Sequence, residues 1–169
     1  MNADDLRSLQ APLKSRYKDE PEAALVTLKA DGDLSGEDLV CRVETGKALV
    51  EAGLHPATGG TGLSACSGDM LLQALVACAG VTVKAVATAL GITLRGGRVL
   101  AEGDLDFRGT LGVDKAAPVG FRAIRLRFEL DADADAEQQA SLLKLTERYC
   151  VVYQSLRTPP EFEVKLQAG

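Results

Sequence analysis

The segment from Met70 to Leu90 constrains the fold more than any other feature, because it is apolar at nearly every position. About 20 such residues are enough to cross a bilayer. Lys84 and Gln73 interrupt the run, however, and much of its apolar content is alanine, which favours membrane insertion far less than leucine or phenylalanine. We therefore expect no membrane partner and interpret the segment as the buried central helix of a soluble core. A helix this apolar needs cover on all sides, so we also expect a homodimer in which two central helices pair.

Turn and capping signals divide the rest of the chain. Ser67 is a favourable N-cap for the central helix and Gly91 a favourable end, and Asp135 with Gln138 has the spacing of a capping box that opens a second helix running to about Cys150. Alternating or β-branched runs predict strands at 23–29, 39–44, 48–51, 93–107, 121–130 and 161–166, with turns at 31–33 and 45–47 and a glycine-rich loop at 55–62. The strands before the central helix form a small antiparallel meander in this interpretation.

This order of elements predicts an α+β fold, with antiparallel sheets packed around the long buried central helix. Residues 1–20 are expected to form an N-terminal arm or short helix, and residues 21–169 a single domain, which is the ordinary size for a chain of 169 residues.

Charge and composition exclude several classes of partner. The formal net charge is −5 and no basic stretch is present, which argues against nucleic acid or anionic lipid. The first residues are acidic where an export signal needs a basic start, so a cytoplasmic location is expected. Four cysteines without a C-x-x-C pair and a single histidine, His55, predict no metal site and no cofactor. The acidic run 131–135 lacks the glycine and distal glutamate of a calcium loop.

Three cysteines are candidates for chemistry. Cys78 falls on a small, apolar face of the central helix, where a thiol is either an inert core residue or, with activation, a reactive one. Cys150 lies at the predicted end of the second helix, where the dipole disfavours a thiolate, so it suits a resolving role better than an attacking one. Cys66 precedes the start of the central helix, where amides and the dipole favour an anion.

The segment SGDMLLQALVAC at 67–78, followed by ERYCVVYQSL at 147–156, resembles the OsmC family, which includes the organic hydroperoxide resistance proteins. The resemblance covers about residues 23 to 166. It implies an intertwined homodimer with the central helices at its heart and an active site at each subunit interface. It further implies that Cys78 is the thiolate that attacks an organic hydroperoxide, and that Cys150 condenses with the resulting sulfenic acid to form a disulfide that an external thiol reduces.

The family pattern also implies a glutamate ten residues before the attacking cysteine and an arginine from the N-terminal strands. This chain has Gly68 at the first position. Asp69 is adjacent, but nine residues before Cys78 it lies about 180° round an ideal helix from it. Arg16 and Arg42 are the candidates for the cation.

Two functions of different classes follow. The first is a thiol-dependent peroxidase for organic hydroperoxides, in which Cys66 is either uninvolved, a third redox thiol or the attacking one. The second is a non-catalytic dimer that binds an apolar small molecule at the subunit interface and uses its cysteines as core residues. A Cys–His hydrolase built on His55 is the weakest alternative, because no spacing rule ties His55 to a cysteine.

Overall fold

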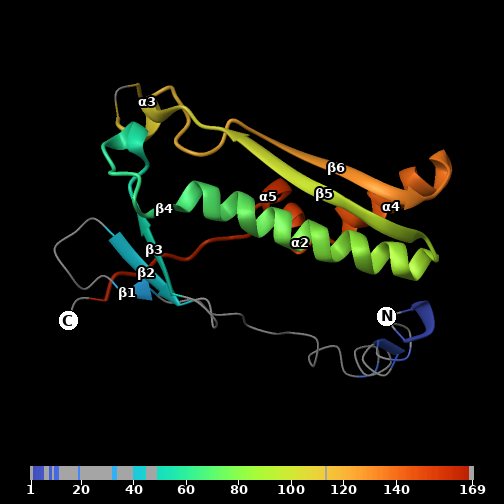
Figure 1. Cartoon of the computed structure of the whole chain (residues 1–169). Helices are drawn as coiled ribbons and strands as arrows, with labels where there is room; N and C mark the ends of the chain where they lie inside the picture. The colour runs from blue at the N-terminus through green and yellow to red at the C-terminus, as the bar shows by residue number, and fades with distance from the viewer. Residues whose placement is uncertain are drawn as a thin grey trace.

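The computed structural model describes residues 2–5, 8, 10–11, 19, 32–33, 40–44, 49–112 and 114–167. Its described part is α+β, as the sequence predicts (Figure 1). A long helix, α2, packs against a two-stranded sheet and against two shorter helices. The elements are β1 (Gly32–Asp33), β2 (Val40–Glu44), β3 (Leu49–Gly53), a 3₁₀ turn (Pro56–Thr58), β4 (Ala65–Cys66), α2 (Ser67–Leu90), β5 (Thr93–Asp104), α3 (Phe107–Thr110), β6 (Ala123–Asp133), α4 (Ala136–Tyr149) and α5 (Val151–Arg157).

The ends of α2 lie close to the predicted positions. Gly91 ends the helix in the left-handed conformation, with a φ of 71°, and its amide donates to the carbonyls of the last turn. The predicted N-cap, Ser67, is wrong: the helix begins one residue earlier and Cys66 is the cap, without a side-chain hydrogen bond. The reason is that Cys66 belongs to β4 and pairs with Gly53, which holds its backbone extended just before the helix.

The burial of α2 is one-sided within a single chain. Its buried residues lie on one face and pack against β5, β6 and α4; they are Leu75, Ala79, Val83, Val86 and Ala87. On the opposite face Val81 is 72% exposed. The prediction of a buried central helix is therefore confirmed for one face only. By length and composition α2 is also apolar enough to span a membrane, but a core helix of a soluble protein passes the same test.

The sheet formed by β5 and β6 follows the predicted alternation. The apolar residues of β6, from Ile124 to Leu130, turn towards the helices, whereas the intervening arginines and glutamates are exposed. The exposed side is crossed by ion pairs, such as Arg125 with Glu102. Each such surface pair contributes little, on the order of 0 to 1 kcal/mol, so the apolar face of the hairpin stabilises the packing on α2.

A second sheet lies at the end of the molecule where α2 begins (Figure 1). Its strands β1, β2 and β3 are antiparallel, as the predicted meander requires, but β4 joins β3 in a parallel pair that the sequence did not indicate. Gly32 and Asp33 form β1 and pair with β2, so the turn predicted at 31–33 is wrong for these two residues. The strand predicted at 23–29 lies outside the described residues. The division into an arm at 1–20 and a domain at 21–169 stays a prediction.

The C-terminal region differs most from the prediction. Helix α4 ends at Tyr149, close to the predicted end, but a further helix, α5, begins directly after Cys150, although the β-branched pair Val151 and Val152 disfavours a helix by propensity. No strand forms at 161–166 among the described residues, and Phe162, Val164 and Leu166 are 82%, 91% and 95% exposed. A strand needs a neighbouring strand to satisfy its backbone groups, and no described segment of this chain provides one.

The capping box of α4 forms as predicted. The Gln138 amide donates to the Asp135 carboxylate at 2.8 Å, and the Asp135 amide donates to the Gln138 side-chain oxygen at 2.9 Å. We expect Asp135→Ala to lower the free energy of unfolding by about 1 kcal/mol, because the Gln138 amide at the helix end loses its acceptor. Urea unfolding followed by circular dichroism measures this. Ser141→Ala, an exposed change in the middle of α4, is the control that leaves stability unchanged or slightly raised; an equal loss in both variants contradicts the capping role.

Candidate active site

Cys78 lies near the middle of α2, at the edge of its buried face. Leu75 and Ala79 on either side of it are 1% and 0% exposed, whereas Cys78 itself is partly accessible. The position follows from the helical period, because residues three before and one after Cys78 turn further into the core. Its thiol packs into a cluster of apolar side chains from β5, β6 and α5. Cys78 is thus reachable from one side and surrounded by apolar groups on the other.

Cys150 lies at the junction of α4 and α5. Its backbone is extended, with φ −75° and ψ 106°, so it ends one helix and begins the next. Its amide donates to the Thr146 carbonyl at 3.0 Å, and its carbonyl accepts from the Gln154 amide at 2.9 Å. Cys150 is 0% exposed and belongs to the same cluster as Cys78. The two residues, 72 positions apart in the sequence, are free thiols close enough for each to shift the pKa of the other.

The first amides of α5 are directed at the two sulfur atoms. An α-helix leaves its first N–H groups without partners inside the helix, so they are available to other acceptors. The amides of Val152 and Val151 act to lower the pKa of Cys78, and those of Tyr153 and Val152 act to lower the pKa of Cys150. The helix that sequence reasoning missed therefore supplies donors to both thiols.

These contacts move the acidities of the two thiols in opposite directions. Burial raises the pKa of Cys78, but the Val152 amide, the Cys150 thiol and further hydrogen bonds outweigh it and hold that pKa below its ordinary value. Thr82 contributes least, since its one proton already goes to the Cys78 carbonyl at 2.8 Å. Burial raises the pKa of Cys150, and contact with Cys78 raises it further, more than the Tyr153 and Val152 amides lower it. Cys78 is accordingly the thiol that ionises first.

We therefore expect iodoacetamide at neutral pH to modify Cys78 well before Cys150. The thiolate is the reactive form, and the lowered pKa and partial exposure of Cys78 act in the same direction. Peptide mapping of a Cys66→Ser variant over time separates the two sites. Equal labelling, or earlier labelling of Cys150, contradicts this assignment of acidities.

Of the other sequence-predicted candidates, Cys66 and Asp69 are described and lie away from the thiol pair. Cys66 lies twelve residues before Cys78 on the same helix, and at 1.5 Å per residue the two are about 18 Å apart along its axis. Asp69 is exposed in the first turn of α2. Arg16 lies outside the described residues. Arg42 lies in β2, paired with Glu51 of β3, and its side chain is outside the described part.

His55 has a structural role of its own. Its ring stacks on Phe107 with centroids 4.9 Å apart, and its Nδ1 accepts from the Ala57 amide at 3.0 Å, which caps the 3₁₀ turn. Both partners, Ala57 and Phe107, lie at the end of the molecule that holds the 3₁₀ turn and α3, called the loop end below. Nothing in this geometry ties His55 to a cysteine.

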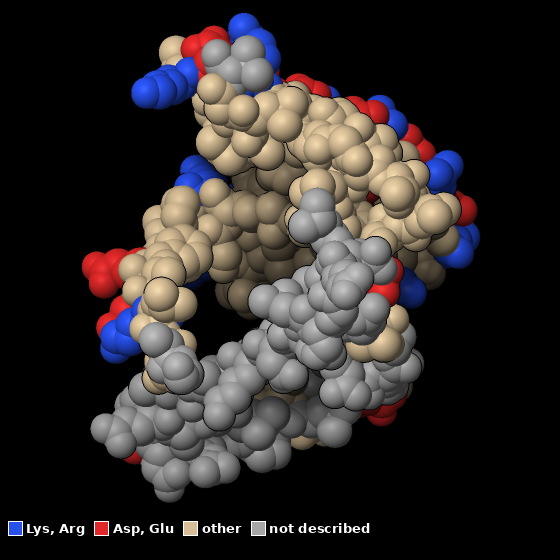
Figure 2. Space-filling view, turned by 90° about the vertical axis from the view of Figure 1, so that its left-hand side faces the viewer, with Lys and Arg blue, Asp and Glu red and all other residues tan. Residues whose placement is uncertain are grey.

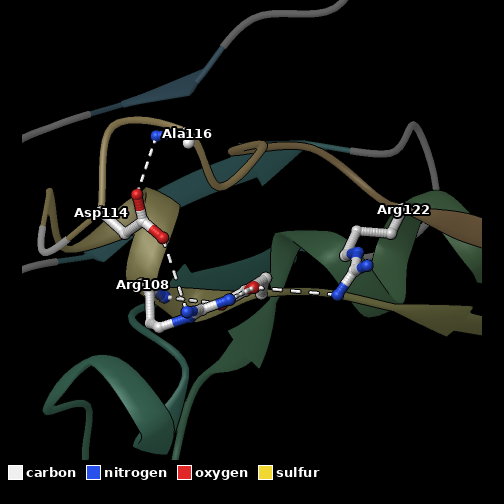
Figure 3. A network of polar contacts seen from close by, with 5 residues as sticks. Arg108, Asp114, Ala116 and Arg122 are labelled. Atoms are coloured by element: carbon white, nitrogen blue, oxygen red, sulfur yellow. Dashed lines mark hydrogen bonds and ion pairs between the residues drawn. The ribbon is translucent and has the colours of Figure 1, made fainter.

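A network of charged residues organises the same loop end (Figure 3). The Arg108 guanidinium donates to the Asp106 carboxylate at 2.6 and 3.0 Å and lies 3.5 Å from Asp114, while Arg122 reaches Asp106 from the other side at 3.8 Å. Hydrogen bonds from Arg108 lower the pKa of Asp106 to about 2. Asp114 also accepts from the Ala116 amide at 2.9 Å. These contacts fix the loop between β5 and β6, away from the thiols.

A pocket of about 490 Å³ adjoins the buried cluster. Its walls include Leu75, Ile124, Leu126, Phe128, Tyr153 and Leu156, which also surround Cys150, and its charged residues are Arg122, Glu147 and Arg157. Neither cysteine lines it. In the described part of the chain, no group of three His, Cys, Asp or Glu side chains is arranged to hold a metal ion.

The fold and the cysteine pair define a class of protein: an α+β domain with a half-buried thiol on its central helix and a second thiol buried beside it. The family model for OsmC-like protein matches residues 60–165, more than half of the chain. The chain belongs to the OsmC family. No curated protein matches it in sequence.

Solved structures agree with this fold. An OsmC-like protein from Mycoplasma pneumoniae has a TM-score of 0.64 at 18% identity, over 79% of this chain and 91% of that one. An organic hydroperoxide resistance protein OsmC from Legionella pneumophila has a TM-score of 0.62 at 19% identity, over 80% and 92%. The organic hydroperoxide resistance protein OhrB of Bacillus subtilis has a TM-score of 0.55 at 19% identity, over 80% and 94%. At these identities the likeness concerns the fold.

Proposed function

We propose that this protein is a thiol-dependent peroxidase for organic hydroperoxides, with Cys78 as the attacking thiol and Cys150 as the resolving one. The observation that carries the proposal is the burial of Cys150 in the same apolar cluster as the partly accessible Cys78, a setting that lowers the pKa of Cys78 and raises that of Cys150. Two structural neighbours are named organic hydroperoxide resistance proteins, which supports the same substrate class. The apolar surroundings of the pair suit an organic peroxide better than hydrogen peroxide.

The chemistry divides into two balanced steps. The Cys78 thiolate attacks the outer oxygen of R–O–OH, the O–O bond breaks, and the products are Cys78 sulfenic acid and an alkoxide that takes up a proton to give ROH. The Cys150 thiolate then attacks the Cys78 sulfur, the S–O bond breaks, and hydroxide leaves as water after protonation. An external dithiol reduces the resulting disulfide and is itself oxidised by two electrons.

The influence of each thiol on the pKa of the other sets the order of the two reaction steps. After burial, contact with Cys78 is a cause of the raised pKa of Cys150. When Cys78 becomes a neutral sulfenic acid, its negative charge no longer opposes ionisation of Cys150, while the Tyr153 and Val152 amides still favour it. Cys150 thus stays protonated until Cys78 has reacted. It then ionises more easily and attacks the Cys78 sulfenic acid.

We further propose a cytoplasmic homodimer in which a second copy covers the exposed face of α2. That face includes Val81 at 72% exposure, with the exposed Lys84 and Gln73 beside it. Figure 2 shows that the described surface on one side of the molecule is largely uncharged around a hollow, with charged residues gathered along the outer edge. Because Cys78 lies at the edge of the buried face of α2, the second copy would close its open side. Arg16 and Arg42 are the proposed activating cations, Asp69 a weaker accessory, and Cys66 an additional redox thiol in the alternative scheme.

Turnover of cumene hydroperoxide with dithiothreitol tests the enzymatic proposal. We expect Cys78→Ser to abolish turnover, because no attacking thiolate remains. Cys150→Ser should consume about one equivalent and then inactivate, since the sulfenic acid is no longer resolved and oxidises further. Cys66→Ser is the matched control and should keep wild-type turnover. Full activity in Cys78→Ser contradicts the proposal, and loss only in Cys66→Ser assigns the chemistry to the loop thiol.

Sedimentation velocity tests the dimer. Val81→Glu should convert the protein to a monomer, because it places a charge at the centre of the face that the second copy covers. Val119→Glu is the control, since Val119 is 65% exposed in the loop before β6, away from that face. A Val81→Glu protein that sediments like the wild type contradicts the proposed interface.

The second candidate function is a non-catalytic protein that binds an apolar small molecule. The pocket of about 490 Å³ beside the buried cluster favours it, because the pocket has largely apolar walls and is not lined by either cysteine. This function predicts that ligand binding survives both Cys78→Ser and Cys150→Ser.

A further inference from the structure

The break between α4 and α5 leaves backbone groups without partners inside either helix. Cys150, with its extended ψ of 106°, interrupts the regular hydrogen bonds. The last carbonyls of α4 and the first amides of α5 therefore need other partners. Val152 and Tyr153 pack in the cluster that holds Cys78 and Cys150, and the amides of Val151, Val152 and Tyr153 act on the two thiols. The carbonyl of Glu147 accepts a hydrogen bond from Nε2 of the Gln154 side chain at 2.7 Å.

Gln154 consequently bonds to both sides of the break. Its backbone amide donates to the Cys150 carbonyl at 2.9 Å and closes the first turn of α5. Its side-chain amide reaches back seven residues to the last turn of α4. The side chain is half-buried, so water competes for this bond less than at an exposed position.

We propose that Gln154 is a positioning residue for the thiol pair: by tying α5 to the last turn of α4, its side-chain amide keeps the free amides of α5 directed at Cys78 and Cys150. Without this bond α5 loses its side-chain tie to α4 and keeps its packing on the core, so that any rotation about Cys150 moves all three free amides at once. As a statement about peroxide turnover the inference rests on the proposed function. As a statement about thiol acidity it is independent of any peroxide chemistry.

Among the described residues, the surroundings of Cys78 leave the first amides of α5 as its main donors. On α2, the Thr82 hydroxyl already donates to the Cys78 carbonyl. On β5 and β6, the neighbours in the cluster are apolar, namely Val99, Ala101, Ile124, Leu126 and Phe128. On α4 and α5, Cys150 is the titratable group in contact with it, whereas Glu147 and Arg157 line the adjoining pocket.

The pH profile of Cys78 alkylation tests the proposal in the full chain carrying Cys66→Ser. Gln154→Met keeps the length of the side chain but removes the donor. We expect the midpoint of the profile to rise by about one pH unit, which is about tenfold slower alkylation at a pH below the midpoint, since a hydrogen bond to a thiolate is charge-assisted. Gln139→Met is the matched control: Gln139 donates to the Ala134 carbonyl at 2.9 Å at the start of α4, far along that helix from the break.

Gln154→Asn is a second variant that preserves a polar amide but is one methylene too short to reach Glu147, so we expect the same shift. Thermal unfolding confirms that each variant is folded at the temperature used. An unmoved profile in Gln154→Met and Gln154→Asn, or an equal shift in Gln139→Met, overturns the positioning role. Because alkylation needs no peroxide, a shifted profile in a protein that does not reduce cumene hydroperoxide supports Gln154 while refuting the peroxidase.

Discussion

The contact between the Cys78 and Cys150 thiols depends on one interruption in the helical backbone. If α4 continued through Cys150, the amides that follow would donate to the carbonyls four residues earlier and none would be available to sulfur. The extended conformation of Cys150 frees them and turns α5 back over α2. The same interruption buries Cys150 completely, which keeps it protonated, and leaves Cys78 partly accessible. One local change of backbone direction therefore gives two chemically identical side chains different acidities: Cys78 ionises first, and Cys150 stays protonated.

The second constraint is the incomplete cover of α2. The hairpin of β5 and β6, with α4, covers one face of the helix, and the opposite face keeps apolar side chains in solvent. The exposed residues at Phe162, Val164 and Leu166 have the same character and the period of a strand. The proposed second copy accounts for two apolar surfaces that no described segment of the chain covers. The dimer and the thiol site are thus linked proposals, because Cys78 lies at the border of the uncovered face.

Much of the fold follows from local rules that the sequence displays. The capping box at Asp135, the glycine at the end of α2 and the alternation along β6 are read from residue types within a few positions of each other, and all three form as predicted. The failures concern interactions between distant segments. Cys66 caps α2 because β4 pairs with β3, and α5 forms against the propensity of Val151 and Val152 because it packs on the core. A strand at 161–166 has the right pattern but lacks a partner in the described chain.

The candidate site shows the same division. The resemblance to the OsmC family indicated Cys78 and Cys150, and the structure places their thiols in contact. The donors that act on them were missed, because backbone amides of Val152 and Tyr153 carry no signature in a sequence; the run CVVYQS after the second helix was the available signal. Arg16 and Arg42 stay predictions, since the side chain of neither is described.

The most direct test of the peroxidase account is the intact mass and peptide map of the reduced protein after one equivalent of cumene hydroperoxide. The account predicts a rapid loss of two protons that maps to a disulfide between Cys78 and Cys150 and is reversed by an external dithiol. A disulfide through Cys66, or a protein whose mass does not change, contradicts it.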